Sequence, residues 1–402
     1  MQNKMTNLPQ GWEVKKLEEI ANIKGGKRLP KGKNLLDNNT KFAYIKVADF
    51  QDNGAINLQN IKFINENTYN VLKNYKIYDD NLYISIAGTI GKSGIIPKEL
   101  NGAILTENAV KLEYIQNNIS NKFMYFFTLS NIFKTQIQTS TKIVAQPKLA
   151  ITRLKQIQIP LPPLKEQERI VGILDESFAK IDESIKILEQ DLLNLDELMQ
   201  SALQKAFNPL KDNAKENYKL PQSWEWKSLE EISENISAGG DKPKNCTENK
   251  TVKNQIPVYA NGVNNNGLVG YTDKATIIKP SLTISTRGTI GFVCIRKEPY
   301  FPIVRLISLI PCENILCLHY LYFCLNFFIA KGEGSSIPQL TIPKFKSLQI
   351  PLPPLKEQEQ IAEHLDFVFE KAKALKELYT KELKDYEELK QSLLNKAFKG
   401  EL

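Results

Sequence analysis

The sequence predicts two α/β (α+β) domains in a pseudo-twofold arrangement, joined by two long antiparallel coiled-coil helices. Three observations predict this fold class: an internal repeat along the whole chain, two stretches with coiled-coil spacing of apolar residues, and short strand-like runs between them. With 402 residues, 42% of them apolar and 24% charged, the chain is long enough for two or three ordinary globular domains.

The repeat has two similar ends and a variable middle. The opening segment "LPQGWEVKKLEEI" (8–20) matches "LPQSWEWKSLEEI" (220–232) at ten of thirteen positions, and "IPLPPLKEQERI" (159–170) matches "IPLPPLKEQEQI" (350–361) at eleven of twelve. The offset is 212 residues at the opening segment and 191 at the closing one, so the middles differ in length. Because binding surfaces diverge more readily than scaffolds, we expect one frame with two different binding surfaces.

Each middle is expected to mix strands and helices. Short apolar runs bounded by Gly, Asn and Asp predict strands in "FAYIKVADF", "NLYISIAG", "AVKLEYI", "IPVYANG", "SLTISTRG" and "IVRLISLI". The runs "SNKFMYFFTLSNIFKTQI" and "ILCLHYLYFCLNFFIA" predict one helix each, just before the closing segments.

A long helix follows each closing segment. Two prolines precede "LKEQE", whose acidic residues suit a first helical turn. Apolar residues then recur at steps of three and four, which predicts a seam at Ile170, Leu174, Phe178, Ile181, Ile185, Leu188, Leu192, Leu195 and Met199, and at Ile361, Leu365, Phe369, Ala372, Leu375, Tyr379, Leu383, Tyr386, Leu389 and Leu393. Two helices of roughly 40 residues would be about 60 Å long and pair with each other; alternatively, each seam packs on a separate partner chain.

The predicted domains are residues 1–160 and 211–351, with helices at 161–210 and 352–402. Counted as Lys and Arg against Asp and Glu, residues 1–160 carry a net charge of +10 and residues 218–351 of +5, whereas residues 161–217 carry −5 and residues 352–402 carry −2. Basic blocks attract polyanions such as nucleic acid, although +5 on a domain of this size is unremarkable by itself.

Several classes of protein are disfavoured. The sequence has neither an apolar run of membrane-spanning length nor a signal-peptide core at its N-terminus, so a cytoplasmic, non-membrane protein is expected. Cys312, Cys317, His319 and Cys324 raise the question of zinc, but their spacing and apolar surroundings favour reduced core cysteines. The sequence contains none of the common phosphate-loop, dinucleotide-binding or zinc-protease motifs, and its two histidines, His319 and His364, are expected to be structural.

The candidate nucleic-acid contacts lie in loops rich in glycine, cations and small polar residues. "KGGKRLPKGK" (24–33) and "SAGGDKPKN" (237–245) share paired glycines, which let backbone approach phosphate, and lysines, which attract it; a solvated basic loop is the alternative. "AGTIGKSG" (87–94) and "TRGTIGFV" (286–293) each carry a cation beside the glycines; they are equally typical of a tight strand connection.

"YANGVNNNGLVGY" (259–271) offers asparagines that can pair with adenine, although Asn–Gly is also simply a turn signal. "TKIVAQPK" (141–148) and "GEGSSIPQ" (332–339) are further DNA-facing loops in this interpretation. The full candidate set is Lys24, Lys27, Arg28, Lys31, Lys33, Thr89, Lys92, Ser93, Lys142, Lys148, Lys242, Lys244, Asn261, Asn264, Asn265, Arg287, Thr289, Ser335 and Gln339.

The duplicated "LP-x-GWE-x-x-x-L-x-E-I" openings, with Ser223 in place of the glycine in the second copy, and the paired "IPLPPL-x-EQ" closings resemble the specificity (S) subunit of type I restriction–modification enzymes, the HsdS family. The resemblance covers essentially the whole chain. It implies two target recognition domains, each reading one half of an asymmetric bipartite DNA site. It also implies that the helices set the spacer and bind two methyltransferase (M) subunits through the seam, with restriction (R) subunits completing the complex.

The same resemblance implies that the chain binds no cofactor and is not an enzyme, because S-adenosylmethionine and adenine-N6 methylation belong to the M subunits. Two other interpretations stay open at this point. One is a self-contained DNA methyltransferase or nuclease with degenerate motifs, and the other is a coiled-coil adaptor that binds only proteins.

Overall fold

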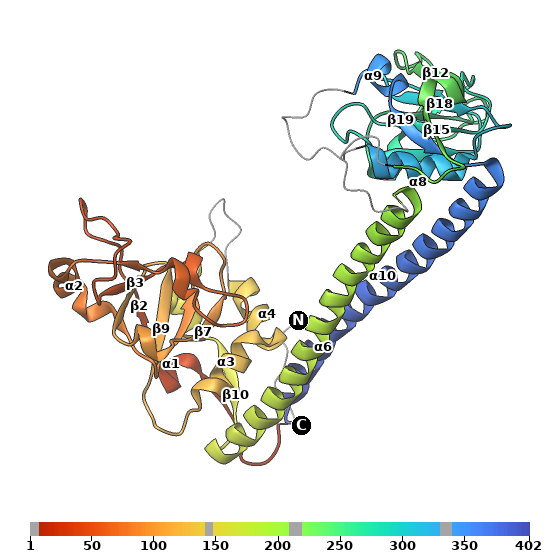
Figure 1. Cartoon of the computed structure of the whole chain (residues 1–402). Helices are drawn as coiled ribbons and strands as arrows, with labels where there is room; N and C mark the ends of the chain where they lie inside the picture. The colour runs from red at the N-terminus through yellow and green to blue at the C-terminus, as the bar shows by residue number, and fades with distance from the viewer. Residues whose placement is uncertain (1–7, 141–147, 209–218, 330–339) are drawn as a thin grey trace. The chain divides into compact units, whose positions relative to one another are not determined.

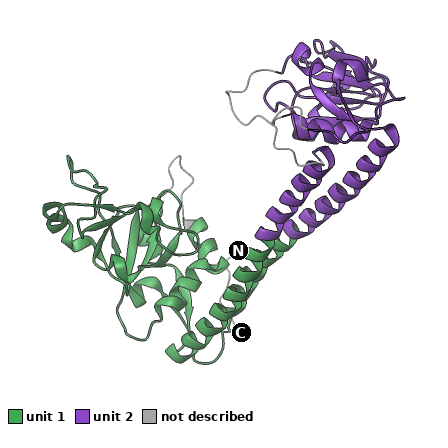
Figure 2. Cartoon of the chain, in the orientation of Figure 1, with its two compact units in different colours: residues 1–188, 381–402 green, residues 189–380 purple. Residues whose placement is uncertain are grey.

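The computed structural model describes residues 8–140, 148–208, 219–329 and 340–402. The chain divides into two compact units, residues 1–188 with 381–402, and residues 189–380 (Figure 2). Each unit therefore takes one middle segment and half of each long helix. The expected fold class, mixed helices and sheets with two long packed helices, is confirmed.

Unit 1 is built on two four-stranded sheets (Figure 1). The first has the order β2-β9-β6-β7 with all neighbours antiparallel, and the second has the order β4-β3-β8-β5 with one parallel pair, β3 and β8. The strands are β2 (Ala21–Gly25), β3 (Ala43–Ile45), β4 (Lys62–Phe63), β5 (Lys76–Ile77), β6 (Leu82–Ser85), β7 (Ser93–Ile95), β8 (Ala103–Leu105) and β9 (Ala109–Tyr114).

Unit 2 repeats the first sheet strand for strand. The order β12-β18-β15-β16 is again antiparallel throughout, and a three-stranded sheet β14-β13-β17 takes the place of the second sheet. The strands are β12 (Ser233–Ala238), β13 (Ile256–Tyr259), β14 (Leu268–Thr272), β15 (Ser281–Ile284), β16 (Val293–Arg296), β17 (Phe301–Pro302) and β18 (Ile307–Pro311). One frame thus carries two different second layers.

The repeated segments pair with each other. In unit 1, β1 (Glu13–Lys16) of the opening segment lies antiparallel to β10 (Gln158–Leu161) of the closing one. In unit 2, β11 (Glu225–Ser228) and β19 (Gln349–Leu352) form the same two-stranded ribbon. The ends of each middle segment are therefore joined to one another by main-chain hydrogen bonds.

Short helices cover one face of the first sheet of each unit, which we call the main sheet. They are α1 (Leu17–Ile20), α3 (Asn121–Leu129), α4 (Asn131–Ser140) and α5 (Ile151–Leu154) in unit 1, and α7 (Leu229–Ile232), α8 (Leu318–Phe328) and α9 (Ile342–Lys346) in unit 2. A further helix of unit 1, α2 (Glu66–Leu72), packs on the second sheet, where Leu72 shares a core with Tyr44 and Ile104. The single helix expected at 120–137 is two helices, because the Ser130 hydroxyl donates to the Phe127 carbonyl and accepts from the Phe133 N–H. Such a side chain offers the backbone an alternative to a continuous helix.

The long helices are α6 (Leu164–Phe207) and α10 (Leu355–Ala397). In unit 1 the first half of α6 packs on the last turns of α10, where Ile170 and Leu174 share a core with Leu394 and Ala397. In unit 2 Leu203 and Phe207 share a core with Ala362 and Leu365. The helices run antiparallel within each unit, and no helix in the described ranges is both long and apolar enough to cross a membrane.

One buried glutamine ties each long helix to its domain. Gln167 in α6 accepts from the Ser120 N–H (2.9 Å) and donates to the carbonyls of Asn118 (3.1 Å) and Pro162 (2.9 Å). Its repeat partner Gln358 makes the same three bonds, with the Cys317 N–H (2.9 Å), the Ile315 carbonyl (2.9 Å) and the Pro353 carbonyl (2.8 Å). We call these three-bond contacts the glutamine clamps.

Candidate nucleic-acid interface

The predicted loops of unit 1 meet at residues 105–108, from the end of β8 to the start of β9. The Lys27 N–H donates to the Leu105 carbonyl (2.9 Å), and the N–H groups of Ile86 and Ala87 donate to the Asn108 carbonyl (2.8 and 3.3 Å). Ala87 also forms a bridge with Lys148. The sheet therefore brings the loops 24–33 and 87–94 to one place, together with the described end of the loop 141–148.

Most of the candidate cations of unit 1 are exposed, and several are ion-paired. Lys24 pairs with Glu113 (2.5 Å) and Arg28 with Glu107 (2.6 Å). The other exposed candidates are Lys27, which lies over the Tyr75 ring, and Lys31, Lys33 and Lys148. Burial alone would raise the pKa of Glu107, but hydrogen bonds from Arg28, from the main chain and from Thr106 outweigh it, so this pKa lies below its ordinary value.

Both glycine loops are tight strand connections with the same main-chain pattern. In unit 1 the Ser85 N–H donates to the Lys92 carbonyl (2.7 Å) and the Gly91 N–H to the Ser85 carbonyl (2.9 Å); in unit 2 Ser285, Phe292 and Gly291 repeat these bonds. Gly88 and Gly288 have φ values of 76° and 69°, which favour glycine. The turn geometry accounts for the glycines in both copies.

The side chains on these connections differ in exposure. Thr89 and Arg287 are exposed, whereas Thr289 is half-buried. Lys92 is about three-quarters buried and pairs with Asp52 (2.7 Å). Ser93 requires a correction: it is 4% exposed and hydrogen-bonded to Thr128 (2.6 Å), so its hydroxyl is part of the interior.

The loops of unit 2 meet around Asn261. Its side-chain amide donates to the Val304 carbonyl (2.7 Å), and its side-chain oxygen accepts from the Thr286 N–H (2.8 Å). Because both ends of this amide are used inside the protein, the expectation that Asn261 reads a base is corrected to a structural role. Asn261 joins the asparagine loop to the second glycine loop.

The other candidates of unit 2 lie at the surface. Asn264 and Asn265 are exposed in a 3₁₀ turn, Asn264–Gly267, in which Asn265 and Asn266 have left-handed backbone (φ 47° and 52°). Lys242 and Lys244 are exposed as well. Lys142, Ser335 and Gln339 lie outside the described residues.

A buried arginine that sequence reasoning missed supports the asparagine loop. Arg296 is 8% exposed, its guanidinium stacks on the Tyr259 ring (3.6 Å to the ring centre), and it donates to Thr283 (3.0 Å) and to the Asn266 carbonyl (2.5 Å). Sequence reasoning also missed Glu107–Asn108 and Val304–Arg305, where the loops meet. The signal available for the second of these was Arg305, a charged residue inside the otherwise apolar run "IVRLISLI".

The cysteines and histidines do not form a metal centre within the described ranges. Cys324 is buried in the core of unit 2, and burial raises the pKa of its thiol. His319 is hydrogen-bonded to Asp366 (2.7 Å), and His364 is exposed. These positions agree with structural or surface roles.

The predicted seam residues lie along the contact between the long helices. Ile170, Leu174, Ile181, Leu188 and Leu365 are buried, and Phe178, Ile185, Leu192, Phe369, Tyr379, Leu383 and Tyr386 are half-buried. The spacing rule overshoots at Leu375 and Leu389, which are 37% and 45% exposed. Asp182–Lys390 in unit 1 (2.6 Å) and Asp196–Lys376 in unit 2 are ion pairs between the helices.

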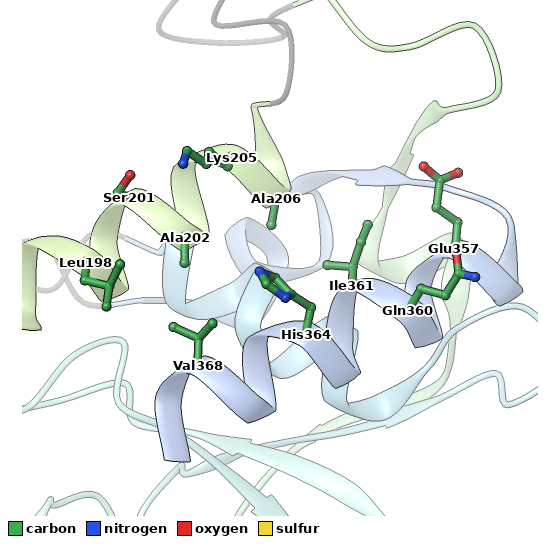
Figure 3. Close-up of a pocket in the computed structure, with 10 residues that line it drawn as sticks. All are labelled: Leu198, Ser201, Ala202, Lys205, Ala206, Glu357, Gln360, Ile361, His364 and Val368. Carbon is green, nitrogen blue, oxygen red and sulfur yellow. The ribbon is translucent and has the colours of Figure 1, made fainter. Parts of the chain in front are cut away.

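Apolar side chains are also exposed on both long helices, at equivalent positions. Ile187 and its repeat partner Leu378 are 56% and 55% exposed, and Leu198 and its partner Leu389 are 52% and 45% exposed. In unit 2, Leu198 borders a groove of about 550 Å³ between the helices, with Ala202, Ile361 and His364 on its walls (Figure 3). Exposed apolar side chains that recur in both copies are typical of contact sites for a protein partner.

The chain matches the type I restriction modification DNA specificity domain twice, over residues 9–192 and 221–384. A putative type I specificity subunit of Mycoplasma pneumoniae is 29% identical over 357 residues, which cover 87% of each chain. A putative type I restriction enzyme specificity subunit of Methanocaldococcus jannaschii is 24% identical, and the matched region covers 98% of this chain and 94% of that subunit.

Solved structures show the same fold. A chain from a study of complex assembly and conformational transition in a type I restriction–modification system covers 98% of this chain with a TM-score of 0.81 and 20% identity. The HsdS subunit of Thermoanaerobacter tengcongensis covers all of it with a TM-score of 0.60 and 20% identity. With two family domains, two sets of loops that differ in chemistry and relatives named for specificity rather than catalysis, the chain belongs to the type I restriction–modification DNA specificity subunits.

Proposed function

We propose that each unit of this specificity subunit reads one half of an asymmetric, bipartite DNA site with the loops gathered at its main sheet. The observation that carries the proposal is that the same sheet gathers different chemistry in the two units. In unit 1 the loops present Lys27, Lys31 and Lys33, whereas in unit 2 they present Asn264, Asn265 and Arg287. Lysines supply sequence-independent attraction to phosphate, and asparagine and arginine form the common base-specific pairs.

We propose that the long helices set the spacer between the half-sites and bind two methyltransferase subunits. Ile187 with Leu378, and Leu198 with Leu389, place like side chains at equivalent positions of α6 and α10. Two copies of one surface suit two copies of one partner. Restriction subunits complete the assembly, S-adenosylmethionine is bound by the methyltransferase subunits, and the complex works on DNA in the cytoplasm.

The test maps methylated adenines in DNA treated with the chain and the methyltransferase subunit of its own system. We expect a two-part, asymmetric motif that disappears when the chain is left out. Replacing residues 21–145 by the corresponding segment of another specificity subunit should change one half of the motif and leave the other intact. A change in both halves would contradict the assignment of one reader to each unit.

Two controls separate the competing interpretations. Methylation or cleavage by the chain alone, with S-adenosylmethionine, would show a self-contained enzyme. A pure protein adaptor would not bind duplex DNA in a salt-dependent manner, whereas a reader with lysine-rich loops should lose affinity as the salt concentration rises.

A further inference from the structure

Two consecutive residues of unit 2, Val304 and Arg305, adopt a strained backbone. Their φ values are 54° and 59°, in the left-handed region that favours glycine, and neither is a glycine. A β-branched residue such as valine is a genuine outlier there. The sequence "IVRLISLI" predicts a strand from Ile303 onward, yet β18 begins only at Ile307. Strain of this kind is retained where the surrounding structure enforces it, and it is concentrated at functional sites.

The surrounding loops enforce this conformation through every polar main-chain group of the two residues. The N–H groups of Val304 and Arg305 donate to the carbonyls of Gly240 (2.8 Å) and Gly239 (2.9 Å). The Val304 carbonyl accepts from the Asn261 side chain (2.7 Å), and the Arg305 carbonyl accepts from the Thr286 hydroxyl (3.1 Å). Three separate loops of the proposed reading surface therefore hold one dipeptide.

Both glycines of the loop 237–245 contribute to this arrangement. A Cβ on Gly239 would lie 2.6 Å from the Ile303 main-chain nitrogen and the Pro302 carbonyl carbon, too close for any side chain. Gly239 also donates its N–H to the Leu306 carbonyl (2.8 Å). Gly239 thus allows the main chain of residues 303–306 to approach closely, whereas Gly240 contributes its carbonyl and a Cβ there would meet nothing within 4 Å.

The side chains of the dipeptide are left at the surface. Val304 is 50% exposed and Arg305 is exposed. Among the described residues, the Arg305 guanidinium has neither an ion pair nor a side-chain hydrogen bond. This sets it apart from Arg296, whose guanidinium is stacked and hydrogen-bonded in the interior.

The equivalent dipeptide of unit 1 has the opposite chemistry. The main-sheet register aligns Val110 with Ile307, since Val110 lies opposite Ile84 and Ile307 lies opposite Ile284. Ile84 and Ile284 are equivalent because each stands four residues before a "GTIG" segment. Glu107 and Asn108 therefore correspond to Val304 and Arg305, and Glu107 is engaged by Arg28 (2.6 Å). Of the two equivalent dipeptides, only that of unit 2 itself contains a cation, as expected if the two units read different bases.

We propose that Val304–Arg305 is the base-reading tip of unit 2, and that Arg305 donates two hydrogen bonds to the O6 and N7 atoms of a guanine in the major groove. This inference rests on the proposed function, because it assumes that unit 2 faces DNA. Bidentate arginine–guanine contact is the commonest specific pair, and a fixed main chain aims the planar guanidinium with little loss of entropy. The valine beside it offers an apolar surface to a neighbouring base.

The experiment measures binding of the reconstituted complex with methyltransferase subunits to duplexes randomised at each position of the second half-site. Wild type should select guanine at one position by about 10- to 100-fold, the range expected for one good bidentate pair. R305A should lose the preference at that position alone and keep the first half-site unchanged. R305K retains the positive charge but lacks the planar guanidinium with its two parallel donors. It should keep the overall affinity for DNA and lose most of the preference for guanine.

K297A is the matched control, since Lys297 is an exposed cation of unit 2 that takes no part in the loop contacts described above. It should leave every base preference unchanged. V304G separates a structural role from a reading role, because glycine relieves the backbone strain: the variant should be at least as stable as wild type yet discriminate less sharply.

Three outcomes would overturn the inference. Unchanged base preferences in R305A would show that the residue does not read sequence. A uniform loss of affinity for all duplexes, with a shallower salt dependence, would show a phosphate contact instead. V304G with undiminished discrimination would show that the strain does not serve recognition. By contrast, a wild-type complex without any sequence preference would refute the proposed function itself.

Discussion

At the scale of single residues, tertiary hydrogen bonds decide which polar side chains remain available to a ligand. Asn261 and Ser93 have the residue types and loop positions of nucleic-acid contacts, but one joins two loops and the other lies in the interior. Glycine–lysine loops were predictable from composition. The burial of a single hydroxyl was not, because it depends on Thr128, which lies 35 positions away.

A pH-dependent contribution to stability is expected from Glu107. Since hydrogen bonds from Arg28, the main chain and Thr106 hold its pKa below the ordinary value of 4.5, the carboxylate stabilises the fold above that pH. The stabilisation is lost as the pH falls through the folded-state pKa. Between pH 6 and pH 3.5, wild type should lose more unfolding free energy than E107Q, because only the wild-type carboxylate is protonated in this range.

Urea titrations at the two pH values would measure this difference, with E298Q, a change of an exposed glutamate elsewhere, as the control. An equal loss in wild type and E107Q would show that the pairing with Arg28 does not stabilise the fold. Because Arg28 belongs to the proposed reading surface, the same variant releases a cation toward DNA.

At the scale of elements, the repeat and the apolar spacing were sufficient to predict the long helices and the inner strands of the main sheets, β6, β9, β15 and β18, but not the edge strands β2, β7, β12 and β16. The apolar spacing was less accurate for the seam of α10, where Leu375 and Leu389 fit the spacing and are nevertheless exposed. The spacing selects a strip of the helix surface that is wider than the contact with the other long helix, since a helix that packs on one neighbour buries only part of its apolar face. The break at Ser130 was missed for a different reason, a side chain that competes for main-chain hydrogen bonds.

The buried seam of α6 should be far more sensitive to truncation than its exposed face. Leu174 is completely buried in the core of unit 1, whereas Leu193 on the same helix is 59% exposed. L174A should lower the unfolding free energy by about 2–5 kcal/mol, because it removes apolar contacts and leaves a cavity. L193A should change it by less than about 0.5 kcal/mol. Thermal unfolding of the two variants would decide, and equal effects would contradict the packing described for unit 1.

At the scale of the whole molecule, the chain presents each proposed partner surface twice. The duplication was visible in the sequence, and the apolar spacing leaves Ile187 and Leu378 off both predicted seams, in agreement with their exposure. Their equivalence follows from the repeat, since they are 191 positions apart.

If these two positions hold equivalent partners, single substitutions should remove one partner each. I187D and L378D should each give complexes with one methyltransferase subunit in place of two, and the double variant should bind none, because a charge in an apolar contact is costly to bury. Native mass spectrometry would count the subunits. V252D, a change of a fully exposed valine in a loop of unit 2, should bind two. Loss of both subunits in either single variant would indicate one shared site.

The glutamine clamps have a consequence for how such a chain diversifies. On the domain side they bond only to main-chain groups, the N–H of Ser120 or Cys317 and the carbonyl of Asn118 or Ile315. Main-chain groups are present whatever the side chain, so the joint makes no demand on the sequence of the segment it holds. A genetic crossover within the shared "IPLPPLKEQE" would therefore keep the joint intact and give the chain a new specificity in one step.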